Sequence, residues 1–477
     1  MFPFGINRGL LYFGKRNNPF YLFLKMHKEN TISEDQGDIN SSQQRLLYHQ
    51  SLDKETRYWL EEDAKYFFHQ ALSTPVMNVL SKTEGPYIYD LNGKKYLDMH
   101  GNGVHNAGFN NPKVVEAMMR QMNESLAFTP RRYTNIPAIQ LAKKLAEITP
   151  AGLDRVLFCP GGSEAIEMAV MLAKQITGKW KTISFWDAYH GTGYQASAVS
   201  GQAHFLKGNG PMVPGALHVE FPNYYRNPWN WTDQRAIDDE YLRQIKLLLR
   251  NEPDIAAIVA EPISSTPVVP SAYYWQQIRE ICDREGIFLI FDEIIEGFGR
   301  TGKMFASEHY VTPDVLVLGK SLGGGMLPFA GIVSKSKYNI LQDSSIGHFT
   351  HEKNPLCCAA GLAEIEYIEE NNLVENAAQK GEYLMNTFRE MQEKYPIIGN
   401  VAGRGFHIGI DLVKDPHTKQ RAYEEAERIM YRCMERGLAF KIIEGNVITL
   451  RPSLVLSQDQ CEFIVNTIEE AIKAEMK

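Results

Sequence analysis

The chain has 477 residues, 44% of them hydrophobic, and carries 50 basic against 57 acidic residues. A chain of this length can bury a large core and has room for roughly two to four domains. Because the net charge of −7 is spread along the sequence, nothing marks a nucleic-acid surface, and a small molecule is the expected partner. The six cysteines form no CxxC motif, which favours reduced thiols in a cytoplasmic protein.

The first 28 residues are basic and aromatic and include no acidic residue. No apolar run in them or later in the chain approaches the roughly 20 residues that span a bilayer, so no membrane partner is expected. Their composition leaves open a targeting or surface-anchoring segment and a flexible extension. Residues 29–52 are rich in Ser, Gln, Asn and Asp, which is typical of a linker. We therefore predict a flexible basic extension and linker over residues 1–52.

A β-hairpin is the first structured element that the sequence predicts. The run PYIYDLNGKKYLDM (86–99) alternates apolar and polar residues on both sides of Asn92-Gly93, a strong short-range hairpin signal. We assign residues 53–105 to the N-terminal segment of a small domain.

Short apolar runs separated by helix-length amphipathic stretches begin near residue 150. They are VLFC (156–159), TISFW (182–186), IAAIVA (255–260), IFLIF (287–291) and VLVLG (315–319). Runs that are apolar throughout fit strands covered on both faces. The pattern predicts an α/β fold, with a large doubly wound, mainly parallel sheet domain over residues 106–345. Residues 346–477 predict an interface loop, a connecting helix and a C-terminal α+β small domain, which the early hairpin can join.

Charged residues directly follow three of these runs, namely Glu261, Asp292 and Lys320. Ligands of open α/β sheets bind outside the carboxyl ends of the strands. The three residues are separated by about one βα repeat each, so we expect them at one edge of the sheet. A lysine that is partly desolvated there has a lowered pKa and can form a Schiff base with an aldehyde.

Two further motifs belong to the same edge. In FCPGGSEAIEMAVMLAK (158–174), Gly161 and Gly162 precede Ser163 at a helix start, whose free N–H groups favour a phosphate. Tyr189 and His190 follow the run TISFW and bring two rings to this edge. A capped strand-to-helix turn and a core Tyr-His pair are the structural alternatives. Taken together, a lysine, a phosphate site, an aromatic face and a carboxylate match what pyridoxal phosphate requires.

These motifs also resemble a known family. DEIIEGFGRTGKMFASEHY and PDVLVLGKSLGGGMLPFAGIV resemble the signature of the class III (ω-amino acid type) aminotransferases, which are fold type I enzymes using pyridoxal 5'-phosphate. YDLNGKKYLDMHGNG, PGGSEAIEMA and NPLCCAAGLA extend the resemblance over roughly residues 75–470.

The resemblance implies roles for individual residues. Lys320 would be the catalytic Schiff-base lysine, and Asp292 the partner of the pyridinium nitrogen. Further cofactor contacts would come from Gly161, Gly162, Ser163, Tyr189 and His190. Thr350 lies at the position of the threonine that reaches the phosphate of the neighbouring subunit, which implies a homodimer with shared active sites.

The chain departs from the family pattern near the substrate. Ile295 stands where the family usually has a glutamine near the cofactor's ring oxygen. The loop EPISSTPVVP is shorter than the family's EPIQGEGG type and lacks the glutamate that gates a substrate-binding arginine. Arg451 lies two positions later than the usual arginine. These changes weaken the recognition of two alternating substrates on which glutamate transamination depends.

Several residues suggest an anionic substrate. Arg131, Arg132 and Tyr133 lie in FTPRRYTN, the segment that lines the family's substrate pocket. Because guanidinium groups suit bidentate recognition of phosphonate, phosphate or carboxylate, these residues and Arg451 are candidate substrate ligands. Surface arginines at a helix start remain the alternative for the pair.

RRYTNIPAIQLAKKLAEITP and IGHFTHEKNPLCCAAG resemble the phosphonate-degrading branch of the family. That resemblance implies an ammonia-lyase that converts 1-hydroxy-2-aminoethylphosphonate to phosphonoacetaldehyde and ammonia in phosphonate catabolism. The alternative is an aminotransferase that passes the amino group of an ω-amine or ω-amino acid to a keto acid. A remote alternative is a nucleotide-binding P-loop in GFGRTGKM (297–304), where Met304 replaces the magnesium-binding Ser or Thr. No metal site is expected, because His348 and His351 lack a third ligand.

Overall fold

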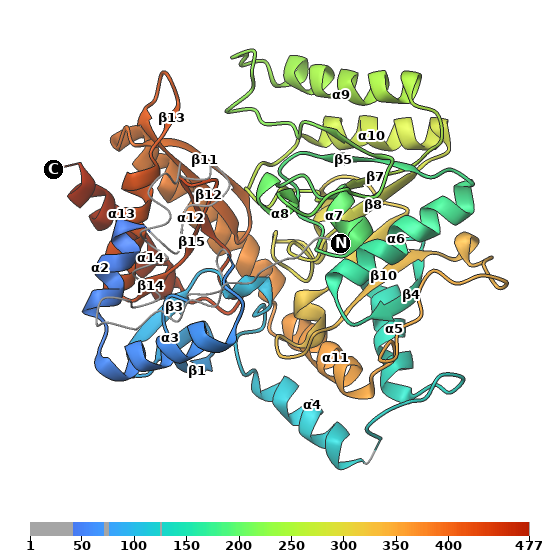
Figure 1. Ribbon diagram of the computed structural model, residues 1–477, viewed down its shortest axis with the longest axis horizontal. Coiled ribbons are helices and arrows are strands. Elements are labelled where there is room, and N and C mark those ends of the chain that lie inside the picture. Colours follow the sequence, from blue (N-terminus) through green and yellow to red (C-terminus); the bar gives the residue numbers. More distant parts are fainter. Residues whose placement is uncertain (1–41, 71–75, 125, 477) are drawn as a thin grey trace, which may run out of the picture.

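The computed structural model describes residues 42–70, 76–124 and 126–476. One lobe combines the first and last parts of this chain, and the other is built from its middle (Figure 1). The two lobes therefore join segments that lie far apart in the sequence.

A seven-stranded sheet forms the centre of the middle lobe, with the strand order β4-β10-β9-β8-β7-β5-β6. The strands from β9 to β6 are parallel, whereas β10 is antiparallel to both of its neighbours. All five predicted apolar runs lie in this sheet, which confirms the α/β, mainly parallel fold. The strands are β4 (Leu153–Cys159), β5 (Lys181–Phe185), β6 (Ala216–Val219), β7 (Ile255–Ala260), β8 (Phe288–Asp292), β9 (Val315–Leu318) and β10 (Ala330–Lys335).

The central strands are apolar throughout because helices cover both faces of the sheet. Leu289 and Phe291 of β8 belong to the core cluster that includes Trp275 of α10 (Ala272–Glu285). The alternate residues of the strand, including Ile290, pack in a second cluster with Ile166 of α6 (Gly162–Thr177). The other helices of this lobe are α4 (Pro112–Asn123), α5 (Ile136–Ile148), α7 (Tyr194–Val199), α8 (Ala203–Leu206), α9 (Gln234–Asn251) and α11 (Pro355–Glu370). No helix within the described residues is long and apolar enough to cross a membrane.

Two smaller sheets form the other lobe, with the orders β1-β2-β3-β14 and β11-β12-β16-β15 and with β13 beside β12. The predicted hairpin is present as β2 and β3, and β3 pairs in parallel with β14, so the hairpin joins the tail. The limits 53–105, 106–345 and 346–477 remain predictions. The strands are β1 (Leu80–Glu84), β2 (Tyr87–Asp90), β3 (Lys95–Asp98), β11 (Ile398–Arg404), β12 (His407–Asp415), β13 (Gln420–Arg421), β14 (Leu438–Ala439), β15 (Lys441–Ile443) and β16 (Val447–Leu450), and the helices are α3 (Lys54–Tyr66), α12 (Leu373–Lys394), α13 (Tyr423–Glu435) and α14 (Gln458–Glu475).

The predicted linker is wrong over its last part, because helix α2 (Gln43–Ser51) lies within it. The side chain of Ser42 caps this helix by accepting a hydrogen bond from the backbone N–H of Arg45 at 3.0 Å. Tyr48 of α2 packs against Tyr431 of α13, with ring centroids 5.5 Å apart. The polar composition of residues 43–51 therefore led to the prediction of a linker where the structure has a helix packed against α13. Residues 1–41, which make up the rest of the predicted extension, lie outside the described residues.

Candidate active site

The structure brings Glu261, Asp292 and Lys320 to one edge of the sheet, as their spacing predicts. They lie at the carboxyl ends of β7, β8 and β9, which are consecutive neighbours. The register pairs Ala260 with Phe291 and Asp292 with Val317, so the three ends are level.

Lys320 begins a short 3₁₀ turn, η3 (Lys320–Gly323), and has a positive φ of 48°. The chain at Gly103 comes so close that a Cβ there would lie 3.5 Å from Cδ of Lys320. Burial lowers the pKa of Lys320 to about 8, the charge of Arg451 adds to this effect, and nearby carboxylates such as Asp292 oppose it. The side chain is half-buried, so its amine can act as a nucleophile and as a proton acceptor near neutral pH.

Asp292, whose charge acts on this lysine, forms a buried pair with His190. Nδ1 of His190 lies 2.8 Å from Oδ2 of Asp292, and the backbone N–H of Ile294 donates to the other carboxylate oxygen at 3.1 Å. Burial disfavours the charged imidazole, but the hydrogen bond and charge of Asp292 outweigh burial and raise the pKa of His190. The pair fixes the direction of the carboxylate, as a partner for a protonated ring nitrogen requires.

The start of α6 is built for an anion. Gly161 is its N-cap and offers no side chain, so the first N–H groups of the helix keep no side-chain cap. The hydroxyl oxygen of Ser163 accepts from the N–H of Thr192 at 3.0 Å. A Cβ at Gly191 would lie 2.3 Å from that oxygen, so only glycine lets the loop after β5 approach the helix. Gly162 is the first residue of the helix.

Tyr189 supplies the aromatic group at this edge. It is half-buried beside Phe205, with ring centroids 4.7 Å apart. Burial raises its pKa and the charge of Asp292 adds to this, which places the ring near the carboxylate. The residues present thus fit pyridoxal phosphate: the start of α6 would hold the phosphate, Lys320 the aldehyde, Asp292 the ring nitrogen and Tyr189 a ring face.

The turn after β8 is a structural link between the lobes. Glu293 is buried and accepts the N–H groups of Ala306 and Ser307 at 2.5 and 2.7 Å. Arg300 is buried and donates to the carbonyl of Pro452 and to the side chain of Asn106. The P-loop alternative is wrong, because the segment after the turn enters a short 3₁₀ turn, η2 (Ala306–His309), instead of a helix.

Sequence reasoning missed two buried polar residues beside this turn. Both carboxylate oxygens of Glu296 and both ring nitrogens of His407 lack a hydrogen-bond partner, and His407 Nδ1 lies 3.6 Å from Oε1 of Glu296. Burial raises the pKa of Glu296 well above its usual range, with further contributions from Glu261 and Asp292. Glu296 could have been predicted as a buried functional candidate, because it is a charged residue within the largely apolar stretch IFLIFDEIIEGFG. No comparable signal marked His407. Ile295 is half-buried and offers no polar group at the glutamine position.

Arg451 is buried at the end of β16, its charge acts on Lys320, and no carboxylate of the described residues forms an ion pair with it. Burial lowers the pKa of Arg451, and the charges of Glu296 and Glu261 oppose this. Its Nη2 donates to the carbonyl of Ser265, and its Nε has no hydrogen-bond partner. Ser265 in turn binds Glu261, through its N–H at 2.9 Å and its hydroxyl at 2.6 Å. The shortened loop after β7 therefore gives Arg451 a main-chain carbonyl.

Arg131, Arg132, Tyr133 and Thr350 lie apart from these residues. All four are exposed and line a hollow of about 560 Å³ that does not include Lys320. Its wall also contains Phe128, Thr129, Pro130, Thr134, His348, Phe349, Glu352 and Lys353. Arg131 lies 3.7 Å from the carboxylate of Glu352. Within one chain, the candidate substrate ligands thus divide between two places.

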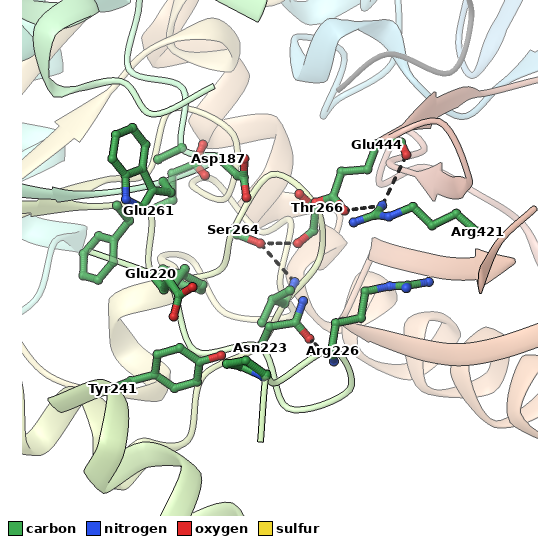
Figure 2. A pocket seen from close by; sticks show the side chains of 16 residues that line it. Asp187, Glu220, Asn223, Arg226, Tyr241, Glu261, Ser264, Thr266, Arg421 and Glu444 are labelled. Atoms are coloured by element: carbon green, nitrogen blue, oxygen red, sulfur yellow. Dashed lines mark hydrogen bonds and ion pairs between the residues drawn. The ribbon is translucent and has the colours of Figure 1, made fainter. Parts of the chain in front are cut away.

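A second hollow, of about 260 Å³, lies between the lobes beside Glu261 (Figure 2). The other lobe contributes Arg421 and Glu444, which pair at 2.6 Å. Arg226, also in its wall, pairs with Asp411 at 2.6 Å. Because both arginines are already neutralised, this hollow does not offer a site for an anion.

Comparisons with known proteins agree with this geometry. A family model described as Aminotransferase class-III matches residues 69–472. An (R)-1-hydroxy-2-aminoethylphosphonate ammonia-lyase from Vibrio splendidus (strain 12B01) is 40% identical over 93% of this chain and 95% of its own length. A leucine/methionine racemase from Thermococcus litoralis is 35% identical over 83% of this chain and 90% of its own length. Among solved structures, a PLP-bound amine transaminase from an uncultivated Pseudomonas species has a TM-score of 0.80 at 30% identity and covers 86% of this chain and 98% of its own.

Proposed function

The chain belongs to the class III aminotransferase family, whose cofactor is pyridoxal 5'-phosphate, and we propose that it is an ammonia-lyase acting on 1-hydroxy-2-aminoethylphosphonate. The products are phosphonoacetaldehyde and ammonia, so the reaction belongs to phosphonate catabolism. The 40% identity to an ammonia-lyase of this substrate over nearly the whole chain supports the proposal.

The environment of Arg451 is the structural observation that most strongly supports an ammonia-lyase over an aminotransferase. An aminotransferase must admit two substrates in turn, and the resemblance to the family implies a glutamate that pairs with the substrate-binding arginine between them. Here the guanidinium group donates to the carbonyl of Ser265, and within the described residues no carboxylate forms an ion pair with it, although the charges of Glu296 and Glu261 act on it and oppose the lowering of its pKa by burial. An arginine that is not ion-paired with a carboxylate suits an enzyme that binds one anionic substrate.

The proposed roles of the residues follow from their positions. When bound, pyridoxal phosphate supplies an aldehyde for the substrate's amine and a ring that accepts electrons from the adjacent carbon. Lys320, with its pKa near 8, removes a proton from the carbon that carries the amine. Asp292 keeps a proton on the ring nitrogen, and His190 holds Asp292 in place. Loss of the neighbouring hydroxyl leaves an unsaturated amine, which water hydrolyses to the aldehyde and ammonia.

We further propose a homodimer with shared sites. Thr350, Arg131 and Arg132 line one exposed hollow whose wall does not include Lys320, which supports a role for them in the site of another copy. Exposed apolar side chains on α4, α5 and the segment between them, among them Met122, Ile136 and Ile139, suit a surface that a second copy covers.

We also place the enzyme in the cytoplasm. All six cysteines lie within the described residues, and each is buried and unpaired. Free thiols in this number suit a reducing compartment.

One assay tests the reaction. The purified holoenzyme is incubated with 1-hydroxy-2-aminoethylphosphonate and no keto acid, and ammonia is measured over time. Release of many equivalents per subunit is expected. A single turnover that leaves the amino group on the cofactor would instead identify an aminotransferase of an ω-amine or ω-amino acid, the alternative that the similar transaminase structure favours.

A further inference from the structure

Glu296 is a buried acid beside the candidate site to which the proposed reaction gives no role. Its side chain is fully buried, and neither carboxylate oxygen has a hydrogen-bond partner among the described residues. Glu293 differs in this respect, because the N–H groups of Ala306 and Ser307 donate to its carboxylate. A buried polar group that pairs with no part of the protein is costly, which points to a role in binding or catalysis.

The turn that carries Glu296 packs on the strand that leads to Lys320. The N–H of Gly297 donates to the carbonyl of Glu293 at 2.9 Å, which closes one helical turn after β8. A Cβ at Gly297 would lie 3.4 Å from Cδ2 of Leu318, which is two residues before Lys320. In agreement with this packing, the charge of Glu296 acts on Lys320 and opposes the lowering of its pKa by burial.

The same carboxyl group lies beside the end of β16. His407 Nδ1 lies 3.6 Å from Oε1 of Glu296. Ile408, the next residue of β12, pairs with Leu450 of β16, which directly precedes Arg451. Glu296 therefore lies between the ends of β9 and β16, that is, between the proposed proton acceptor and the candidate arginine for the anionic group.

This position matches the bond that must break in the proposed substrate. In 1-hydroxy-2-aminoethylphosphonate the amine is on one carbon, and the hydroxyl and the phosphonate are both on the next. With Lys320 at the first carbon and the phosphonate at Arg451, the hydroxyl lies between these two residues, where Glu296 also lies. Hydroxide is a poor leaving group near neutral pH, so its departure requires an acid.

We propose that Glu296 is the general acid that protonates the departing hydroxyl. The inference rests on the proposed function for the identity of the substrate. As Lys320 takes the proton from the amine-bearing carbon, the electrons of that C–H bond form the new C=C bond, and the C–O bond breaks with its electron pair on oxygen. Glu296 gives its proton to this oxygen, which leaves as water. One proton is gained at Lys320 and one is lost at Glu296, so the step needs no further reactant.

Burial keeps Glu296 in the protonated form that this role requires. It raises the pKa of Glu296 well above the usual range and outweighs the opposing charge of Arg451. Three neighbouring carboxyl groups raise the pKa further, namely those of Glu261, Asp292 and Glu293. His407 faces the acid with a neutral ring, because burial lowers the pKa of this imidazole well below 6.5. Glu296 can thus donate a proton at a pH at which exposed carboxyl groups are ionised.

The test compares two leaving groups in the holoenzyme. The substrates are 1-hydroxy-2-aminoethylphosphonate and the analogue in which fluorine replaces the hydroxyl, because fluoride can leave without being protonated. The variant is Glu296→Gln, which keeps the size and the neutral charge of the protonated acid. Glu364→Gln is the matched control, because the carboxyl group of Glu364 is also buried with a raised pKa but is held by Ala107 and Ser321. Ammonia and fluoride release are measured, together with exchange of the hydrogen on the amine-bearing carbon into deuterated water by NMR.

Glu296→Gln should release ammonia from the hydroxyl substrate about 10²–10³-fold more slowly than the wild type, with little change in KM. On the fluorinated analogue it should keep most of the wild-type rate, because no acid is needed there. Hydrogen exchange should continue in this variant, since Lys320 is intact. Glu364→Gln should match the wild type in all three measurements. Cofactor absorbance and circular dichroism confirm that each variant is folded.

Equal losses on the two substrates, or a loss of hydrogen exchange, would overturn the inference, because Glu296 would then act on the structure of the site or on the earlier proton transfer. The two proposals can fail separately. Ammonia release at the same rate by the wild type and by Glu296→Gln would reject the general acid and retain the lyase. No ammonia release by the wild type from the hydroxyl substrate would reject the proposed function, and the inference with it.

Discussion

Two regions of this protein gather basic side chains, the sheet edge around Lys320 and the exposed hollow around Arg131. At the sheet edge, the side chains of Asp292, His190 and Arg451 are buried and fixed by hydrogen bonds to other elements of the same chain. In the hollow, the arginines are exposed, and Arg131 lies near a surface carboxylate. Burial makes each charge at the edge strongly felt by its neighbours, whereas water screens the charges of the hollow. The difference supports the proposal that one chain builds the reacting centre and that the hollow completes a site in a second copy.

Replacing Lys320, at the sheet edge, should have the largest effect on the rate of ammonia release. Lys320→Ala should lower the rate of ammonia release by about 10³-fold or more, because both the nucleophile and the proton acceptor are lost. The yellow, borohydride-reducible chromophore should also disappear. A variant that kept this chromophore would show that another lysine binds the cofactor.

A somewhat smaller loss of activity is expected from replacing Asp292. Asp292→Asn keeps the shape of the side chain but removes the charge that holds the ring nitrogen protonated. The rate should fall about 10²–10³-fold, while the cofactor stays bound through Lys320. Single-turnover kinetics and the absorbance spectrum separate this outcome from simple loss of cofactor.

Mixing variants tests whether the hollow serves a second copy. An Arg131→Ala, Arg132→Ala protein and a Lys320→Ala protein should each be weakly active alone. Heterodimers formed by reassociating an equal mixture contain one site with both functions, so roughly a quarter of wild-type activity should return. If no activity returns although heterodimers form, the two regions do not share a site.

The smallest effect concerns stability at the buried edge. One carboxylate oxygen of Glu364 accepts from the N–H of Ala107 at 3.0 Å and from the hydroxyl of Ser321 at 2.9 Å, and the other has no hydrogen-bond partner. Burial raises the pKa of Glu364 to about 7. The folded protein therefore holds this proton more tightly than the unfolded chain, and stability falls as the pH rises from about 4.5 to about 7.

Glu364→Gln can keep both hydrogen bonds and carries no charge. At pH 8 it should be more stable than the wild type by up to about 3 kcal/mol, with little gain at pH 4.5. Urea unfolding of the holoenzyme at both pH values measures the difference. An equal gain at both pH values would show that burial of the charge is not the cause.

The sequence predicted the elements whose signals are local. Five apolar runs became neighbouring strands, and the residues after three of them met at one edge, because parallel strands order their carboxyl ends together. Helix α2 was missed because its polar sequence resembles a linker and its stability comes from packing against α13. His407 and Glu296 could not be paired from sequence, since 111 positions separate them and only the packing of β12 against the turn joins them.

The amino-acid sequence by itself determined the α/β class, the edge at which chemistry takes place and the family, since these follow from short periodic patterns and from motifs in order along the chain. Only the tertiary structure decided which charges are compensated. It gave Arg451 the carbonyl of Ser265 as a partner and left Arg131 and Arg132 on an exposed surface. The physical reason is that the interaction energy of a charge, and its pKa, depend on burial and on partners that distant segments supply.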